Sequence, residues 1–136
     1  MASIITTEGL DFAARKVLKD QTWYVAPFEG DYTPTPGLTA ANFPSTATEC
    51  IAYEGASRPE FVESDPVAGS VNNNDAVIEF VMTANKTIYG FALLSSPAKG
   101  GTGGACLGAI RLSAPLTKVA GDMVRVRLSG FFVSAS

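Results

Sequence analysis

Short runs of β-branched and aromatic residues, each closed by Gly, Pro, Asn or Asp, recur along most of the chain and constrain its fold more than any other feature. The clearest run covers residues 123–128, where Val and Leu at the even positions alternate with Met and Arg at the odd positions. Such alternation is typical of a strand with one buried face. Seven or eight runs, with turn signals about 8 to 12 residues apart, predict a mainly β protein with a jelly-roll-like antiparallel β-sandwich.

One short helix is expected before the first strand. Apolar side chains recur there at helical spacing, namely at Leu10, Ala13, Ala14, Val17 and Leu18. Thr6 or Thr7 can cap the N-terminus of this helix, because a hydroxyl at that position accepts hydrogen bonds from free backbone N–H groups. The 136 residues then form a single domain, with an N-terminal arm and helix over about residues 1–20 and the sandwich after them.

The first long strand is expected at residues 22–26, where Pro27 and Gly30 then interrupt it. A Pro-rich excursion follows over about residues 29–47, and its apolar residues show no regular spacing. We predict a long loop here rather than a packed element. Loops of this length are uncommon in compact domains and often carry function, so Tyr32 within the excursion is a candidate for an exposed contact.

The rest of the chain is predicted to form short strands and then longer ones. Short extended stretches are expected at residues 49–53, 60–63 and 67–71, and cleaner strands at 76–84, 87–95 and 105–113. Asn85-Lys86 separates two of the cleaner strands, and this spacing predicts a tight β-hairpin. The Gly-rich residues 99–104 are interpreted as a flexible connection between strands.

Charge is distributed unevenly along the chain, although the net charge is only −3. Residues 29–79 carry nine acids and a single base, Arg58, whereas residues 80–136 carry six bases and one acid. Two interpretations stay open. Either opposite charges pair across neighbouring strands, or the fold has one acidic and one basic face that orient a charged protein partner. Nucleic acid is not expected as a partner, because a pI near 4.8 indicates too few cations for phosphate binding.

The sequence disfavours several kinds of active site. Histidine is absent, which removes the commonest general base and most zinc sites. Glu60 and Glu63 have no catalytic spacing, and the glycines after Lys99 lack the order of a phosphate-binding loop. We therefore predict a protein that is not an enzyme and uses no cofactor, metal or small-molecule substrate. No membrane contact is expected either, since no apolar run approaches the roughly 20 residues of a membrane span.

The two cysteines, Cys50 and Cys106, are predicted to be free and partly buried thiols. They lie 56 residues apart and lack the spacing of a metal or redox site. Residues 1–11 show neither the basic nor the apolar region of a secretory signal peptide. An oxidising compartment is therefore not indicated.

Five short segments, spread over most of the chain, carry a resemblance to a known family. They are residues 4–10 (IITTEGL), 23–25 (WYV), 32–49 (opening with YTP), 88–91 (IYGF) and 121–126 (GDMVRV). Together they resemble the head decoration, or cement, proteins of tailed bacteriophages, in particular those of short-tailed Bordetella phages. The resemblance implies a jelly roll made in the cytoplasm of the host bacterium, which then binds the outer surface of the virion head and clamps the major capsid protein of the shell.

The resemblance also implies that this protein works by contact with other proteins. A strand from either terminus, residues 2–6 or 131–133, can extend a neighbour's sheet, and self-association as a dimer would cover part of an open edge. The candidate contact residues are Ile4, Ile5, Tyr32, Glu54, Glu60, Glu63, Arg125, Arg127 and Phe131. Two alternatives stay open: a tail, fibre or baseplate component, and a carbohydrate-binding β-sandwich that stacks sugars on Tyr32, Tyr53 or Trp23.

Overall fold

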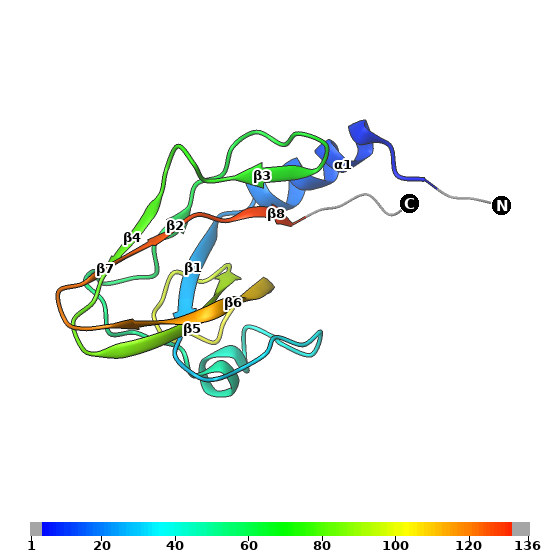
Figure 1. The fold of residues 1–136 in the computed structure, drawn as a ribbon. Helices are drawn as coiled ribbons and strands as arrows, with labels where there is room; N and C mark the ends of the chain where they lie inside the picture. Colours follow the sequence, from blue (N-terminus) through cyan, green and yellow to red (C-terminus); the bar gives the residue numbers. More distant parts are fainter. Residues whose placement is uncertain (1–3, 132–136) are drawn as a thin grey trace.

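The strands form three antiparallel sheets in the computed structural model, which describes residues 4–131 (Figure 1). The largest has the strand order β2-β1-β5-β6, built from Glu60–Phe61 (β2), Trp23–Phe28 (β1), Lys86–Leu94 (β5) and Cys106–Lys118 (β6). The two smaller sheets pair Ile78–Val81 (β4) with Met123–Val126 (β7), and Ser70–Asn72 (β3) with Ser129–Phe131 (β8). The prediction of a mainly β fold with antiparallel pairing and one short helix is confirmed.

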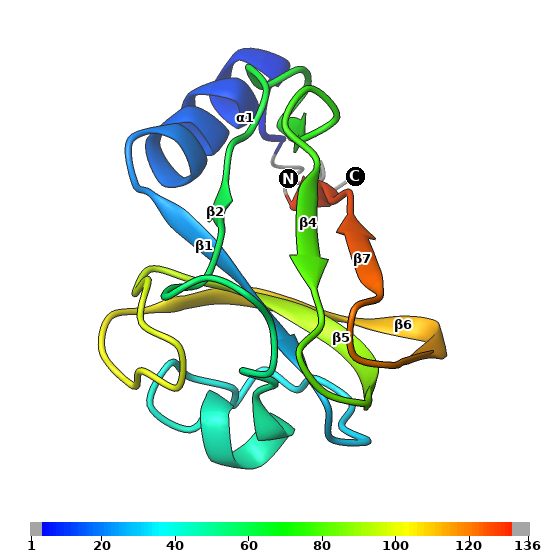
Figure 2. The same cartoon turned by 90° about the vertical axis from the view of Figure 1, so that its left-hand side faces the viewer.

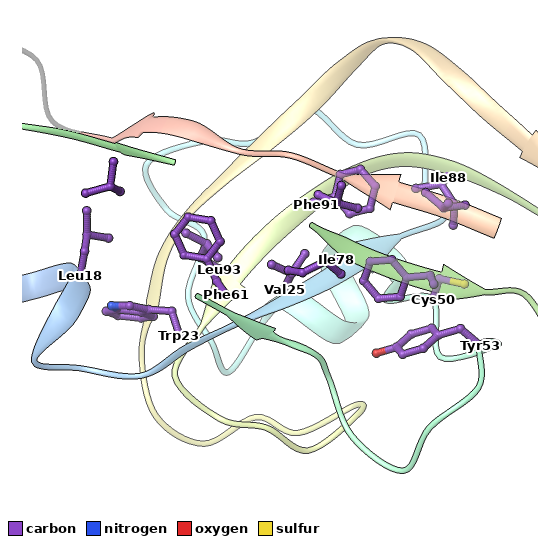
Figure 3. Close-up of a cluster of buried hydrophobic side chains, with 14 of the residues drawn as sticks. Leu18, Trp23, Val25, Cys50, Tyr53, Phe61, Ile78, Ile88, Phe91 and Leu93 are labelled. Atoms are coloured by element: carbon purple, nitrogen blue, oxygen red, sulfur yellow. The ribbon is translucent and has the colours of Figure 1, made fainter. Parts of the chain in front are cut away.

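The main hydrophobic core lies between the four-stranded sheet and the β4–β7 pair, which stands over one face of that sheet (Figure 2). Val25 and Phe91 point into this space from the sheet, and Ile78 points into it from the other layer (Figure 3). All three side chains are buried. The core therefore forms because each layer has a face of alternating apolar residues to remove from water.

The predicted helix forms α1 (Thr7–Ala14) and continues as the helical segment η1 (Arg15–Lys19). Thr6 is its N-cap, and the Thr6 hydroxyl accepts a hydrogen bond of 3.0 Å from the N–H of Gly9. Leu10, Ala14 and Leu18 form the buried stripe, as the helical spacing predicts. The prediction of this helix and its cap is confirmed.

Strand β1 runs through Pro27, so the prediction that this residue ends the strand is wrong. The N–H of Val25 donates to Pro59, and the carbonyl of Pro27 accepts from Cys50, both on the side of β1 away from β5. On that side, β2 pairs only with the first two residues of β1. Pro27 therefore needs no N–H donor there, and the strand continues without loss of a ladder bond.

The excursion after β1 is a packed cover, whereas its composition predicts an unpacked loop. Its second half forms the helical segment η2 (Pro44–Thr48), in which Ala47 is buried, and Phe43 is buried just before it. Both lie against the face of the sheet that the main core does not use, where the Phe28 and Phe43 ring centroids are 6.3 Å apart. Irregularly spaced apolar residues thus build a second core cluster without a periodic signal.

The predicted hairpin at Asn85-Lys86 is wrong. β4 and β5 flank these residues, but β4 pairs with β7, whereas β5 pairs with β1 and β6. The chain passes between the layers here, with the N–H of Thr83 bound to Ala52 and Asn85 Oδ1 bound to the N–H of Ala120. Neither Asn85 nor Lys86 has the positive φ of a tight hairpin turn, so long-range hydrogen bonds decide the path.

The alternation predicted for the end of the chain is confirmed in β7, where Val124 and Val126 are buried and Arg125 is exposed. Asn73, itself buried, ends this strand. Its Nδ2 donates to the Val126 carbonyl at 3.1 Å, and its Oδ1 accepts from the N–H of Leu128 at 2.8 Å. These two bonds hold the chain as it passes from β7 into β8.

Opposite charges from the acidic middle and the basic end of the chain meet in the fold. The pairs are Lys86–Glu29, Arg111–Asp31 and Arg125–Glu79. The last pair joins directly opposed residues of β7 and β4. These contacts agree with the interpretation that the two halves interleave and cancel each other's charge.

Candidate binding edge on strand β6

Strand β6 is one edge of the four-stranded sheet and has 13 residues (Figure 1). Within residues 4–131, β5 is the only strand that pairs with it. The other side of β6 therefore presents a row of backbone donors and acceptors. Such an edge is a template for a strand of another chain, and proteins usually protect it.

The two halves of β6 differ in protection. In the second half, a single β5 residue, Tyr89, stands against four β6 residues that bulge out, among them Pro115. Bulges and prolines both discourage further strand pairing. The first half, residues 106–111, has no proline and a single extra residue, Leu107, where the register with β5 shifts, so residues 108–111 pair regularly. Its one charged residue, Arg111, is bound to Asp31. We call these six residues the open edge.

The outward-facing backbone groups of the open edge belong to Ala109 and Arg111. The backbone N–H of Val25 donates to Pro59, on the side of β1 away from β5. The odd-numbered residues of β1 therefore point their N–H and C=O groups away from β5. The even-numbered residues of β1 point toward β5 and stand opposite even-numbered β5 residues, so these residues bond to each other. Because successive residues alternate in direction, the odd-numbered β5 residues bond to β6. Phe91 of β5 stands opposite Ile110, whose groups therefore point inward. The groups of the residues on either side of Ile110 point outward.

A groove lies on each face of the open edge. The core-side groove, of about 530 Å³, runs between β6 and the chain from β7 to β8, and Ile110 and Arg127 are among its lining residues. The loop-side groove, of about 360 Å³, lies between β6 and the excursion, and Pro34 and Leu38 are among its lining residues. Both covering layers thus leave room beside this strand.

A strand added to the open edge would place side chains in both grooves. Ala109 packs toward the second core cluster, on the loop side, whereas Ile110 lies on the core side with 52 % of its surface exposed. Consecutive residues of an added strand would alternate in the same way, because a strand has a period of two. The open edge can therefore bind an extended segment by main-chain hydrogen bonds, with one groove on each face for its side chains.

A buried ion pair anchors the loop that leads into β6. The side chains of Arg58 and Glu49 are 0 % and 2 % exposed and share two hydrogen bonds, of 2.9 Å from Nε and 2.7 Å from Nη2. The guanidinium also donates to the carbonyls of Ser96 and Gly101, and Glu49 accepts from the N–H of Gly100. The Gly-rich loop is thus bound at several points, whereas the sequence predicts a flexible connection.

Lys99, at the start of the same loop, is also bound. Its Nζ donates to the Tyr53 carbonyl at 2.6 Å and lies 3.8 Å from the centroid of the Tyr53 ring. Burial lowers the pKa of Lys99 and raises the pKa of the Tyr53 hydroxyl, which has no hydrogen-bond partner among the described residues. The Tyr53 hydroxyl therefore stays neutral. The contacts of the Lys99 ammonium with the Tyr53 carbonyl and ring hold the start of the loop in place.

The prediction of free thiols is confirmed for both cysteines; Cys106 is partly buried, as predicted, whereas Cys50 is fully buried. Burial raises the pKa of Cys50 and of Cys106, so little reactive thiolate is present at neutral pH. In the described part of the chain, no three Asp, Glu or Cys side chains are grouped to hold a metal ion. No helix there is long and apolar enough to cross a membrane.

The predicted apolar contacts lie at the end of the molecule that holds α1 (Figure 2). Ile4 and Ile5 precede α1, and Ile4 is 82 % exposed. Phe12, on the outer face of α1, is 65 % exposed, although the sequence analysis did not single it out. Phe131 is the last residue of β8, where its backbone pairs with that of Ser70, and its side chain lies outside the described structure.

The predicted acidic contacts lie away from the open edge. Glu54 and Glu60 are exposed, and Glu60 belongs to β2, the opposite edge of the four-stranded sheet. Glu63 is half-buried, and this burial raises the pKa of its carboxyl group. The sheet order therefore separates Glu60 from β6, and none of the three residues lines either groove.

The remaining predicted contacts are divided between internal packing and the core-side groove. Tyr32 is half-buried and meets Phe28 edge-on, with 5.9 Å between ring centroids. Arg125 is exposed but bound to Glu79 at 3.2 Å. Arg127 lines the core-side groove, and among the predicted contacts with described side chains it is the one beside β6.

No protein-family model, curated protein or solved structure matches this chain. The function of this protein is therefore inferred from its own residues. Sequence reasoning missed Ala109 and Ile110, because periodicity predicts a strand at 105–113 without saying which strand lies at an edge. It also missed the ion pair, although a single base among nine acids was a readable signal for Arg58.

Proposed function

We propose that this protein is a structural virion protein, a cement protein that binds the outside of an assembled phage head and joins neighbouring subunits of the major capsid protein. The open edge of β6, with a groove on each face, is the observation that carries the proposal. A surface that can accept a strand of a neighbouring chain suits a protein that acts by binding others. The resemblance of the five sequence segments supplies the virion context. A jelly-roll-like strand arrangement and self-association as a dimer belong to the same proposal.

Binding to the assembled shell alone would stabilise that shell by mass action. Each site contributes RT ln(1 + [L]/Kd), which is about 2.7 kcal/mol when the free protein is at 100 times its Kd. The contribution is repeated at every site of the shell. Exposed apolar side chains outside the open edge offer further contact area, at Phe12, Ile51, Val62, Val67 and Met123.

The proposal is tested with phage heads that lack this protein. Purified protein is added to the heads, and cosedimentation gives the number of bound copies. Survival of the heads after heat and osmotic shock is then compared with and without the protein. We expect binding in hundreds of copies and higher survival. Binding of a dozen copies or fewer at the tail, or unchanged survival, would contradict the cement role and favour a tail, fibre or baseplate component.

A matched pair of variants assigns the binding to the open edge. Ile110 and Val119 are 52 % and 51 % exposed, so a charge at either position has a similar direct cost for the free protein. Ile110→Glu places a carboxylate in the core-side groove and should weaken head binding by roughly tenfold or more, the effect of about 1.4 kcal/mol. Val119→Glu should leave binding unchanged. If Ile110→Glu bound heads as tightly as Val119→Glu and the wild type do, the shell would not contact the open edge.

The carbohydrate-binding alternative loses most of its platform in the fold. Trp23 and Tyr53 are both buried in the main core, so neither ring is available to stack on a sugar. Tyr32 keeps an exposed part but packs against Phe28. A glycan-array signal that Tyr32→Ala abolishes would revive this alternative.

A further inference from the structure

We propose that the capsid segment bound at the open edge carries an Asp or Glu side chain, which enters the core-side groove and pairs with Arg127. This chemistry of the partner rests on the proposed function, the binding of a capsid strand along β6. The partner is then an extended segment with an acidic side chain on its core-side face and uncharged side chains on its loop-side face.

Arg127 is one of two cations of this protein that have no partner in the fold. The chain has ten Lys and Arg residues, all within residues 4–131. Seven of them form ion pairs with Asp or Glu. Lys99 donates to two backbone carbonyls instead. Among the described residues, Arg127 and Lys118 alone make no such contact, so the guanidinium of Arg127 is free to bind another molecule.

The backbone on both sides of Arg127 is held in place by one buried side chain. The Nδ2 of Asn73 donates to the carbonyl of Val126, and its Oδ1 accepts from the N–H of Leu128. Asn73 is 1 % exposed, whereas Arg127 is exposed and lines the core-side groove. The fold therefore fixes the point in the groove wall from which this cation extends.

The core-side groove offers Arg127 no acidic neighbour. The other lining residues are apolar or glycine, apart from Ser129. A strand laid along the open edge would exclude water from this groove. An uncharged strand would then remove water from the guanidinium without replacing its hydrogen bonds, which costs free energy. A carboxylate would replace them with charge-assisted bonds, which are stronger where water is excluded. Charge complementarity therefore favours an acidic side chain in this groove.

Gly108 leaves room for that side chain. In the regular part of the ladder, Gly108 stands opposite Leu93 and Ile110 opposite Phe91. Leu93 and Phe91 both belong to the main core, so Gly108 and Ile110 lie on the core-side face of β6. A Cβ atom at Gly108 would meet no other atom within 4 Å. A side chain of the added strand beside Gly108 therefore has open space.

The loop-side groove requires the opposite character. Its lining, which includes Pro34 and Leu38, contains no charged residue. Arg111 lies nearby on β6, but its charge is already bound to Asp31. A carboxylate or ammonium group on the loop side would thus lose water without gaining a partner. Because a strand has a period of two, the two grooves select acidic and uncharged residues at alternating positions of the capsid segment.

Two neutral variants of the full-length protein test the role of Arg127 in head binding. Arg127→Gln removes the charge from the core-side groove. Lys118→Gln is the matched control, because Lys118 is the other unpaired cation and lines neither groove. Arg127→Gln should weaken binding to phage heads by roughly tenfold or more, the usual effect of losing a hydrogen bond between charged groups. Lys118→Gln should bind as the wild type does.

A second pair of variants tests the sign of the partner's charge. Ile110→Glu and Ile110→Lys remove the same apolar side chain from the core-side groove and introduce opposite charges. The glutamate would repel a carboxylate of the capsid segment and compete with it for Arg127, whereas the lysine would attract it. Ile110→Lys should therefore bind heads roughly tenfold or more tightly than Ile110→Glu.

A crosslink identifies the acidic residue directly. Arg127→Lys keeps the positive charge and places a primary amine at the groove. On heads that carry this variant, a water-soluble carbodiimide activates carboxyl groups. The amine displaces the activating group as a urea and forms an amide bond. Mass spectrometry should find position 127 joined to an Asp or Glu of the major capsid protein. The wild-type guanidinium does not couple, so wild-type heads are the control.

The outcomes separate this proposal from the cement role. The proposal would be overturned by Arg127→Gln that binds heads as the wild type does, by Ile110→Lys that binds no more tightly than Ile110→Glu, or by a missing crosslink to the capsid protein. In each case, weaker binding by Ile110→Glu than by the wild type would leave the cement role standing. A wild type that does not bind heads would overturn the cement role and this proposal together.

Discussion

Replacing Glu49 by Gln should destabilise this protein far more than removal of an exposed carboxylate would. Glu49 is the counter-ion of the buried Arg58, and its oxygens accept two hydrogen bonds from the guanidinium and one from the N–H of Gly100. The amide keeps the shape of the side chain but removes its charge. Arg58 would then remain buried as a cation without an anion, in a place where water does not reach it.

The expected loss is about 3–5 kcal/mol of unfolding free energy, the usual cost of breaking a buried ion pair from one side. For a chain of this size, 1 kcal/mol corresponds to roughly 3–4 °C of Tm, so the midpoint should fall by roughly 9–20 °C. The matched control is Glu79→Gln, which removes one half of the exposed Arg125–Glu79 pair. It should cost less than about 1 kcal/mol.

Urea unfolding and thermal melts of the two variants measure this difference. A double variant, Glu49→Leu with Arg58→Met, should recover part of the loss, because neither charge then stays buried. The carbonyls that Arg58 binds, at Ser96 and Gly101, would still lack a donor, so recovery should be incomplete. A loss below about 1 kcal/mol for Glu49→Gln would refute the view that this pair fixes the loop before β6.

Three further predictions concern other positions in the fold. Gly90→Ala should destabilise the fold by about 1–3 kcal/mol or more, because the new methyl group meets the Ile110 carbonyl and the Phe28 ring, whereas Gly108→Ala has open space and should be neutral in the same urea assay. Asn73→Ala should cost about 2–3 kcal/mol, since it leaves the buried Val126 carbonyl and Leu128 N–H without their partner; a loss under about 0.5 kcal/mol would mean that water replaces the amide. Burial raises the pKa of Glu63, so the folded state binds that proton more tightly than the unfolded state does, and this stabilisation is lost as the pH rises through the folded pKa. Glu63→Gln should therefore raise Tm at pH 7 but not at pH 3, and an equal effect at both pH values would contradict the assignment.

Local patterns predicted those parts of the fold that local chemistry determines. The N-cap at Thr6 and the buried stripe of α1 follow from spacing and capping within a few residues. The alternation of buried and exposed side chains in β7 follows from the single buried face of this strand. The Pro27 and Asn85-Lys86 predictions failed because each outcome depends on distant strands, which decide whether an N–H is needed or which strand lies alongside.

The candidate site was predictable only in part, for a related reason. The residues that form the open edge have an ordinary strand pattern, and their importance comes from the place of β6 at the end of the sheet order. The grooves depend on where the excursion and the β7–β8 connection stop, which no spacing in the sequence records. Ile4 and Ile5, by contrast, could be selected from sequence, because apolar residues before a helix cap lie outside any predicted element.

Amide hydrogen exchange along β6, measured by NMR in the free and the associated protein, tests the central claim most directly. In the dilute monomer, the N–H groups of Ala109 and Arg111 should exchange fast, while those of Gly108 and Ile110, which face β5, should exchange slowly. On association with phage heads, the N–H groups of Ala109 and Arg111 should also exchange slowly. Fast exchange at Ala109 and Arg111 in the associated state would show that no strand pairs with this edge and would contradict the account.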